Sequence, residues 1–182
     1  MKKKLGLFFF SLTLTLALLW AGVLAAPGYL VNKRNQEYLI QANGYNNFYH
    51  QGLPDEKFKA FVSPSPDLLY SYLVFNTEKS ALAVEIPPYN DYWVNQMVDD
   101  NTDSFAYVGY KTGSSDPIKF ILYSDDTPPF EAPEGYQIIK SPSTIGTFLL
   151  RYLVRTQDDI RHLESIRRSI RVYAFSNESN KQ

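Results

Sequence analysis

The longest uncharged stretch of the chain lies at its N-terminus. Residues 5–26 carry no charge and are rich in Leu and Phe; three lysines (residues 2–4) precede them and Pro27 follows. At ~1.5 Å per helical residue, these 22 residues extend about 33 Å, enough to cross a hydrocarbon core of ~30 Å. Trp20 lies near the far end, where an interfacial aromatic residue is expected. The pattern predicts a transmembrane helix over residues 5–26.

A cleaved signal peptide has a similar pattern, with a basic start, an apolar core of ~7–15 residues and small residues at the cut. Here the candidate cut is Val23-Leu24-Ala25. The apolar run is longer than such a core, which favours an uncleaved, single-pass anchor in the cell inner membrane. The three lysines then stay cytoplasmic and the C-terminal body is periplasmic. If the segment is cleaved, the body is secreted to the periplasm.

Residues 27–57 form a polar segment between this anchor and the rest of the chain. From Asn32 to His50 the segment contains Tyr and Asn but few aliphatic residues. Residues 33–42 have the composition of a short helix. We interpret residues 27–57 as a stalk or as an outer layer of the domain that follows.

From about residue 58 the pattern becomes that of β-strands. Runs of β-branched, Leu and aromatic residues are separated by Pro, Gly, Asn and Ser at intervals of ~8–12 residues. No sustained helical period interrupts them, which disfavours a parallel α/β sheet. The pattern predicts an all-β domain over residues 58–175, folded as an antiparallel β-sandwich. The predicted strands are residues 67–77, 79–86, 91–98, 104–111, 118–123, 135–140 and 144–154.

A helical pattern begins after Thr156. Thr156 and Asp159 have the spacing of a capping box, with Asp in place of Glu. Apolar residues then recur at near-helical intervals, at Ile160, Leu163, Ile166 and Ile170. This predicts a C-terminal helix over about residues 157–170 that docks on one sheet, followed by a disordered tail at residues 176–182. The remaining face of the helix is charged, with Arg161, Glu164, Arg167 and Arg168.

Composition narrows the class of protein. Apolar residues make up 45% of the chain and aromatic residues 15%, enough for a real core. There is no Cys, which excludes a lipoprotein anchor, a disulfide scaffold and a cysteine metal site. Without the three N-terminal lysines the body has 15 basic and 19 acidic residues, a net charge of −4. We therefore expect no nucleic acid as a partner.

The motifs of common enzymes are missing. The sequence contains no G-x-S-x-G and no phosphate-binding glycine loop. Its two histidines, His50 and His162, lie in a polar loop and on the charged helix, and we expect both to be surface residues. A serine triad is thereby disfavoured.

One acidic segment resembles a calcium loop. Residues 99–103 (DDNTD) place oxygen ligands at alternating positions. Ser104 and Tyr110 stand where that loop requires Gly and Glu. We interpret the segment as an acidic turn between two strands, and we expect neither a metal nor another cofactor.

Arginine is concentrated near the C-terminus, because six of the seven lie between Arg151 and Arg171. A solvated helix face explains most of them, and a docking surface for an acidic partner or for lipid headgroups is the alternative. Arg151 differs because it interrupts an apolar strand. A charge there requires a buried partner or a pocket, and Asp67 and Asp99 are candidates.

Several segments together resemble the domain-of-unknown-function-1254 (DUF1254) family. They keep the family's order and spacing over about residues 58–172. One departure is residues 123–130, where the family commonly has a Gly-Pro and Trp-Gly loop. The matching segments are residues 63–71 (SPSPDLLYS), 91–93 (DYW), 99–105 (DDNTDSF), 107–109 (YVG), 140–144 (KSPST), and 150–156 (LRYLVRT) with Asp158-Asp159.

The resemblance implies an immunoglobulin-like β-sandwich located in the cell envelope. Longer relatives carry a second β-rich domain, which is missing here, so a separately encoded companion β-domain protein is an expected partner. The family supplies no established activity, so fold does not convert into function.

These observations favour a membrane-anchored, extracytoplasmic binding or assembly module with no recognisable catalytic constellation. A structural coat subunit is a related possibility. The alternative from another class is a carboxylate-dependent hydrolase or lyase acting on envelope carbohydrate, with Asp67 and Asp99 as an example of its carboxylate pair. We expect a polar cluster, structural or ligand-binding, made of Asp67, Tyr70, Trp93, Asp99, Asn101 and Arg151.

Overall fold

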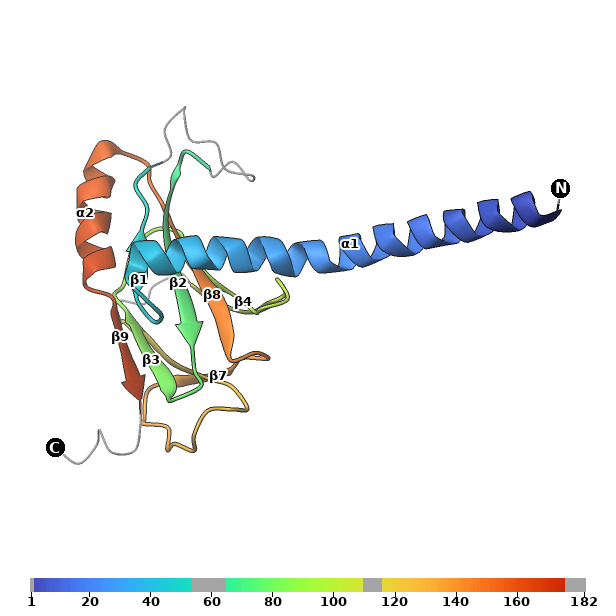
Figure 1. Cartoon of the computed structure of the whole chain (residues 1–182). Helices are drawn as coiled ribbons and strands as arrows, with labels where there is room; N and C mark the ends of the chain where they lie inside the picture. The colour runs from blue at the N-terminus through green and yellow to red at the C-terminus, as the bar shows by residue number, and fades with distance from the viewer. Residues whose placement is uncertain (1, 54–64, 110–115, 176–182) are drawn as a thin grey trace.

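A long helix projects from a body made of two β-sheets (Figure 1). The computed structural model describes residues 2–53, 65–109 and 116–175, so the predicted tail at residues 176–182 lies outside the described residues. The elements in chain order are α1 Lys2–Ala42, β1 Phe48–His50, β2 Leu68–Asn76, β3 Ala81–Ile86, β4 Trp93–Val98, β5 Ser104–Gly109, β6 Ile118–Tyr123, β7 Gln137–Lys140, β8 Ile145–Leu153, α2 Gln157–Arg168 and β9 Arg171–Phe175.

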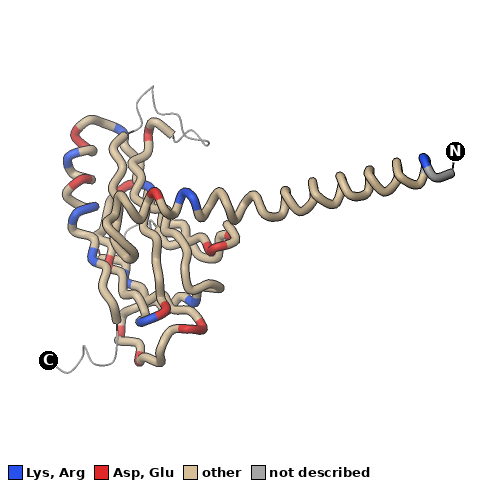
Figure 2. The backbone as a smooth tube through the Cα atoms, viewed as in Figure 1, with Lys and Arg blue, Asp and Glu red and all other residues tan. Residues whose placement is uncertain are grey.

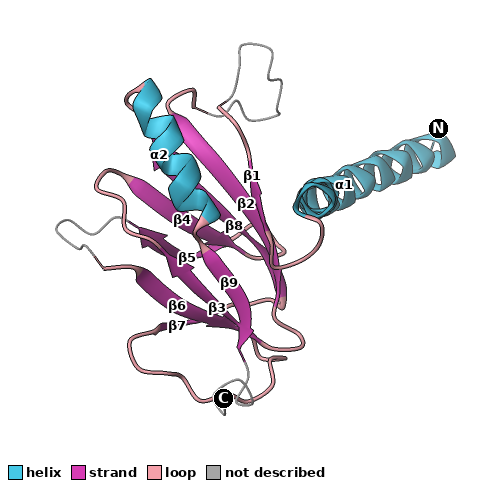
Figure 3. Ribbon diagram, turned by 90° about the vertical axis from the view of Figure 1, so that its left-hand side faces the viewer, coloured by secondary structure: helices cyan, strands magenta, loops and turns pink. Residues whose placement is uncertain are grey.

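The strands form two packed sheets, which confirms the prediction of a β-rich sandwich (Figure 3). Sheet A has the order β1-β2-β8-β4-β5, and sheet B has the order β7-β6-β3-β9. Every pair is antiparallel except β6 and β7, which are parallel. The prediction of a purely antiparallel sandwich was wrong for this pair. The connection over residues 124–136 is long enough to carry the chain back before β7 begins, as a parallel pair requires.

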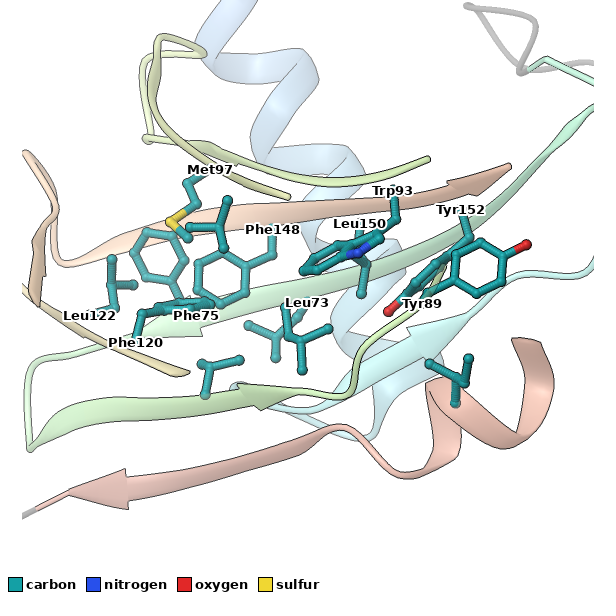
Figure 4. Packing of buried hydrophobic residues seen from close by; sticks show 14 of the residues in the cluster. Leu73, Phe75, Tyr89, Trp93, Met97, Phe120, Leu122, Phe148, Leu150 and Tyr152 are labelled. Atoms are coloured by element: carbon teal, nitrogen blue, oxygen red, sulfur yellow. The ribbon is translucent and has the colours of Figure 1, made fainter. Parts of the chain in front are cut away.

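Alternation along the strands places the main core between the sheets. In β8, residues with even numbers are buried and their odd-numbered neighbours are partly exposed. The buried side chains of both sheets interdigitate in one cluster (Figure 4). Its members include Leu73, Phe75, Tyr89, Trp93, Met97, Phe120, Leu122, Phe148, Leu150 and Tyr152.

Helix α1 does not end at Pro27, as the sequence predicted, but continues to Ala42. The expected short helix at residues 33–42 is the last part of α1. Proline removes one backbone hydrogen bond from a helix interior, which costs about 3 kcal/mol. Packing of the polar part of α1 against sheet A offsets this loss.

That packing covers β2 on the face of sheet A that points away from sheet B, called the outer face below. The rings of Tyr38 and Tyr72 stack with centroids 4.2 Å apart, and the Thr147 hydroxyl donates to Asn35 Oδ1 (2.9 Å). β2 is therefore buried on both faces: Val74 on the outer face is buried, as is Leu73 on the face toward sheet B. The segment that was predicted to be a stalk or outer layer thus contributes a covering helix and the edge strand β1.

Helix α2 joins sheet A to sheet B and confirms the predicted capping box. The Thr156 hydroxyl accepts from the backbone N–H of Asp159 (3.4 Å), while the Asp159 carboxylate accepts from that of Thr156 (2.7 Å). The predicted apolar stripe enters the core through Leu163 and Ile166. Arg167 is also buried, contrary to its predicted place on the solvated face. It lies one turn after Leu163, so its alkyl stem follows the apolar side of the helix.

A second, smaller cluster covers the far face of sheet B. Ala83, Ile121 and Phe175 form it together with Phe130, which comes from the connection before β7. The rings of Phe130 and Phe175 meet edge to face at 6.1 Å. The segment that departs from the family pattern therefore packs on sheet B.

Gly146 of β8 faces the ring of Phe75 and the backbone of β4. A Cβ at this position would lie 2.3 Å from Phe75 Cζ and 2.4 Å from the Val98 carbonyl oxygen. We expect Gly146→Ala to lower the free energy of unfolding by roughly 1–3 kcal/mol, because a packed core resists added atoms.

Urea unfolding of the full chain in detergent measures this effect. Gly52→Ala is the matched control, because a Cβ there meets no atom within 4 Å; its midpoint should stay within about 0.5 kcal/mol of the parent. Equal midpoints for both variants would contradict the close approach of β2, β8 and β4.

Candidate functional site

The six residues of the predicted polar cluster lie in separate parts of the fold. Two pairs of them are neighbours: Tyr70 and Arg151 lie directly opposite each other on β2 and β8, and the Asn101 N–H donates to Asp99 Oδ1. Trp93 lies between the sheets, 5.9 Å from the ring of Tyr152. Asp67 precedes β2, while Asp99 and Asn101 belong to the β4–β5 turn. A ligand role for these residues stays a prediction.

Arg151 has a neutral partner instead of the expected carboxylate. Strand alternation places it on the outer face of sheet A beside Gln96, and Arg151 Nη2 donates to Gln96 Oε1 at 2.7 Å. Asp67 and Asp99 were wrong as candidate partners, because both lie beyond the ends of the strands. Arg151 Nε is buried and has no acceptor.

The acidic turn is held by its own backbone. Asp99 Oδ1 accepts from the N–H groups of Asn101 (2.9 Å) and Asp103 (2.8 Å), while Thr102 has a φ of +79°. A short polar side chain that accepts from the backbone two residues on is a common way to close a turn. Among the described residues, no three His, Asp or Glu side chains lie close enough together to hold a metal ion.

Asp67 and Asp99 lie at opposite ends of sheet A. The Asp67 carbonyl accepts from Val154 just after β8, whereas Val98 pairs with Thr147 near the start of β8. At ~3.3 Å per residue these two rows are about 20 Å apart. Glycosidase carboxylates lie only ~5–10 Å apart. This particular pair therefore lacks the geometry of a glycosidase site.

The most distinctive polar site is a groove between β1 and the end of α2. Two adjoining cavities, of about 440 and 160 Å³, share His50, Arg167 and Arg168. The larger one reaches the loop between α1 and β1 and the start of β9; Gly52 and Glu164 line the smaller one. We call this the edge groove, because β1 and β9 are edge strands of their sheets.

Arg167 connects the three elements that meet at the groove. Its Nη1 donates to the carbonyl oxygens of Gln51 (2.8 Å) and Tyr70 (3.2 Å), so α2 is tied to β1 and β2. Only 4% of the residue is exposed, and burial lowers the pKa of its guanidinium. No carboxylate of the described residues lies within 4 Å of it, although Glu164 attracts it from one turn earlier.

His50 faces the same groove. One of its ring nitrogens, Nδ1, lies 2.8 Å from the Ser71 hydroxyl. Burial, followed by the positive charges of Arg167 and Arg168, lowers the pKa of His50 to about 4. At neutral pH the imidazole is therefore uncharged, and the charged groups that the described residues place at the groove are two guanidiniums and the Glu164 carboxylate.

Three buried donors around Arg167 have no acceptor among the residues that the structure describes. They are Arg167 Nε, the Tyr152 hydroxyl and the side-chain amide nitrogen of Gln51. The Gln51 carbonyl already binds Arg167, and the charge of Arg167 opposes the rise that burial causes in the pKa of Tyr152. A buried donor without a partner costs about 1–3 kcal/mol, so such a group marks a place where an acceptor would be stabilising.

Little in the sequence indicates this groove. His50 was expected to be a surface residue, but it is half-buried on a three-residue strand that is too short to produce a pattern. The only signal was the pair Arg167-Arg168 beside an apolar stripe. His162, by contrast, is exposed as expected.

The lowered pKa of His50 makes stability depend on pH. Between about pH 6.5 and 4 the unfolded chain binds a proton at His50 that the folded chain does not, so stability falls as the pH decreases through this range. We expect His50→Asn to reduce this loss, measured by urea unfolding at pH 7.5 and 4.5.

His162→Asn is the matched control and should keep the parent's pH dependence. All buffers should be free of phosphate and carboxylate anions. If His50→Asn loses as much stability between the two pH values as the parent, His50 is not the buried neutral base described above.

Two solved structures have a similar fold. The VPA0106 protein from Vibrio parahaemolyticus matches with a TM-score of 0.62 and 15% identity over 86% of this chain and 38% of that one. An uncharacterized protein from Burkholderia cenocepacia gives a TM-score of 0.48 and 10% identity over 87% of this chain and 41% of that one. This chain thus spans about two fifths of either protein. The first likeness supports the fold alone.

No curated protein sequence matches this chain. Residues 45–174 match a protein family described as a protein of unknown function, DUF1254. The match begins just before β1 and ends within β9, so it includes both sheets, α2 and the lining of the edge groove apart from Ala42 and Asn43. The chain therefore belongs to the DUF1254 family.

Proposed function

We propose that this chain is a membrane-anchored binding or assembly module of the cell envelope, with α1 in the inner membrane and the β-sandwich in the periplasm. The observation that carries this proposal is the bare apolar part of α1. By length and composition the helix can cross a membrane, and its apolar window is not buried anywhere in the protein. Figure 2 shows this part extending from the body without charged residues beyond its first turn. A helix that is apolar on all sides requires lipid around it.

Retention of the segment is favoured over cleavage by the continuity of α1. The helix runs through the candidate cut after Ala25 and remains helical to Ala42. Cleavage would require local opening of this helix. Packing of Asn35 and Tyr38 on sheet A would then hold the domain close to the end of its anchor.

The proposed orientation follows from charge. Lysines at residues 2–4 favour a cytoplasmic N-terminus, and the body on the other side has a net charge of −4. A mildly acidic body has no electrostatic reason to bind nucleic acid.

The proposed assembly role is supported by the VPA0106 protein, in which the region similar to this chain makes up 38% of a longer chain. We include in the proposal a separately encoded companion β-domain protein. An immunoglobulin-like strand arrangement, implied by the family resemblance, also stays a prediction. Nothing in the placement of Asp67 and Asp99 favours the alternative of a carbohydrate hydrolase or lyase.

Anchoring is tested by a pair of exposed positions on α1. Leu18 is 65% exposed within the apolar segment, and Ile40 is 77% exposed beyond it. An arginine near the centre of a membrane helix costs about 2.5–3.5 kcal/mol on insertion scales. We expect Leu18→Arg to reduce the fraction of chain that stays in membranes after carbonate extraction, while Ile40→Arg behaves like the parent.

The mass of the extracted protein distinguishes anchor from signal peptide. We expect the mass to show an intact N-terminus. We also expect protease added to spheroplasts to remove a C-terminal tag, because the body would lie outside the inner membrane. A soluble periplasmic chain that begins after residue 25 would overturn retention.

Assembly is tested by pulling the full-length protein out of its native membrane in mild detergent. We expect a companion polypeptide in a fixed ratio to this chain, identified by mass spectrometry. Samples with the tag alone and with Leu18→Arg show which polypeptides bind non-specifically. Recovery of this chain without a companion would contradict the assembly role but not the anchoring.

A further inference from the structure

We propose that the edge groove binds an oxyanion, a carboxylate or phosphate group of a soluble polar ligand, through Arg167 and Arg168. Of the predicted polar cluster, only Tyr70 is involved, because its carbonyl oxygen accepts from Arg167. Binding of an oxyanion at this groove does not depend on the proposed membrane anchoring. The choice of a soluble ligand over a lipid headgroup does rest on that proposed function.

The first argument is the buried charge of Arg167. A buried cation is normally paired with an anion, and removing it from water without one is costly. Here two neutral carbonyls bind Nη1, and among the described residues no carboxylate completes the pair. An oxyanion in the groove would supply the missing negative charge.

The second argument is the orientation of the free donors. Nη1 is committed to Gln51 and Tyr70, while Nε, on the other edge of the guanidinium, has no acceptor. The Nε edge of an arginine is one that carboxylates and phosphates bind in a two-pronged manner. The amide of Gln51 and the hydroxyl of Tyr152 are further buried donors without partners.

The third argument is the balance of charge around the cavity. Arg167 and Arg168 lie in the last turn of α2, where the helix dipole contributes about half a negative charge that opposes an anion. Glu164 adds one negative charge in the smaller cavity. Two full positive charges outweigh the dipole and remain close to the bound group. His50 is neutral and lies beside Ser71 of β2, so it contributes no charge to this balance.

The size of the groove fits a small polar molecule. Its larger cavity, of about 440 Å³, lies at the lower end of the range for ligand pockets. Phe48, Ile170 and Val172 also line this cavity, although its exposed lining is mostly polar. The groove therefore has room for an oxyanion attached to a group the size of one sugar.

The position of the groove favours a soluble ligand over a lipid headgroup. Ala42 lines the groove, and fifteen residues of helix separate it from Pro27, a distance of about 22 Å. Figure 1 shows that the C-terminal end of α1 lies at the body, whereas the apolar part projects away from it. With α1 in a bilayer, headgroups of that bilayer lie out of reach of the groove.

The two histidines allow a direct test with the full-length chain in a neutral, phosphate-free detergent. His50 lines the groove and His162 does not. Inorganic phosphate and glucuronate, titrated separately at constant ionic strength, should each shift the His50 ring resonance saturably. Each should also raise the pKa of His50 from about 4, because a bound anion stabilises the imidazolium. The resonances of His162 should stay in place.

Matched arginine variants locate the binding. Arg168→Gln should weaken phosphate binding by about tenfold or more, because a charge-assisted contact is lost. Arg161→Gln removes the same charge from an exposed position of α2 and should bind as the parent does. Arg167→Lys keeps the charge but loses the fork, and should also weaken binding when its melting temperature shows that it folds.

Several outcomes would overturn the proposal. One is no change of the His50 resonance up to about 10 mM phosphate, ten times a millimolar Kd. A second is a shift of His50 in chloride as large as that in phosphate. Others are an equal loss of binding in Arg161→Gln and Arg168→Gln, or a shift of the His162 resonance as large as that of His50. Each of these results indicates general screening of charge. A shift of His50 in phosphatidylglycerol nanodiscs but not in phosphatidylcholine nanodiscs, with no response to free phosphate, would assign the groove to a headgroup and overturn the soluble source. None of these readouts measures anchoring, so the two proposals fail separately.

Discussion

The buried guanidinium of Arg167 is the contact on which the open edge of the sandwich depends. Two backbone carbonyls, from Gln51 and Tyr70, fix it in place and thereby fix the end of α2 against the first two strands of sheet A. Since α2 leads directly into β9, the same contact sets where sheet B meets sheet A at this edge. The carbonyls satisfy one nitrogen but do not neutralise the charge. A structural need therefore leaves a cationic groove as its consequence.

The other constraint on the architecture is that α1 has two parts of different polarity, of which only the polar one packs on the body. Its first part is apolar on all sides and makes no contact with the body, whereas its last part is polar and covers the outer face of β2. Because one continuous helix does both, the place where it packs on sheet A also determines how far the sandwich lies from the apolar end. The stacked rings of Tyr38 and Tyr72 are thus as important for positioning as for stability.

The sequence predicted those features that depend on local pattern. Strand alternation located β2 to β8, and the Thr156–Asp159 spacing located the start of α2. It failed where distant contacts decide the outcome. β1 has only three residues, β7 is parallel because of the length of the connection before it, and Pro27 is tolerated because α1 packs beyond it. Arg151 finds Gln96 through strand register, which no pattern along one segment contains.

The same distinction explains why the candidate site had to come from the structure. Polar residues that stand out in the sequence find partners nearby: Asp99 accepts from the backbone of its own turn, and Arg151 donates to the amide oxygen of Gln96. Arg167 looked like an ordinary member of a charged helix face, and its burial emerges only when β1 closes over the helix end. Unsatisfied donors gather where three segments distant in sequence meet, since no single segment can supply acceptors for all of them. The edge groove is such a meeting point, and it lies at the end of α1 opposite to the apolar segment, so that the proposed anchoring and the proposed binding would occupy separate ends of one helix.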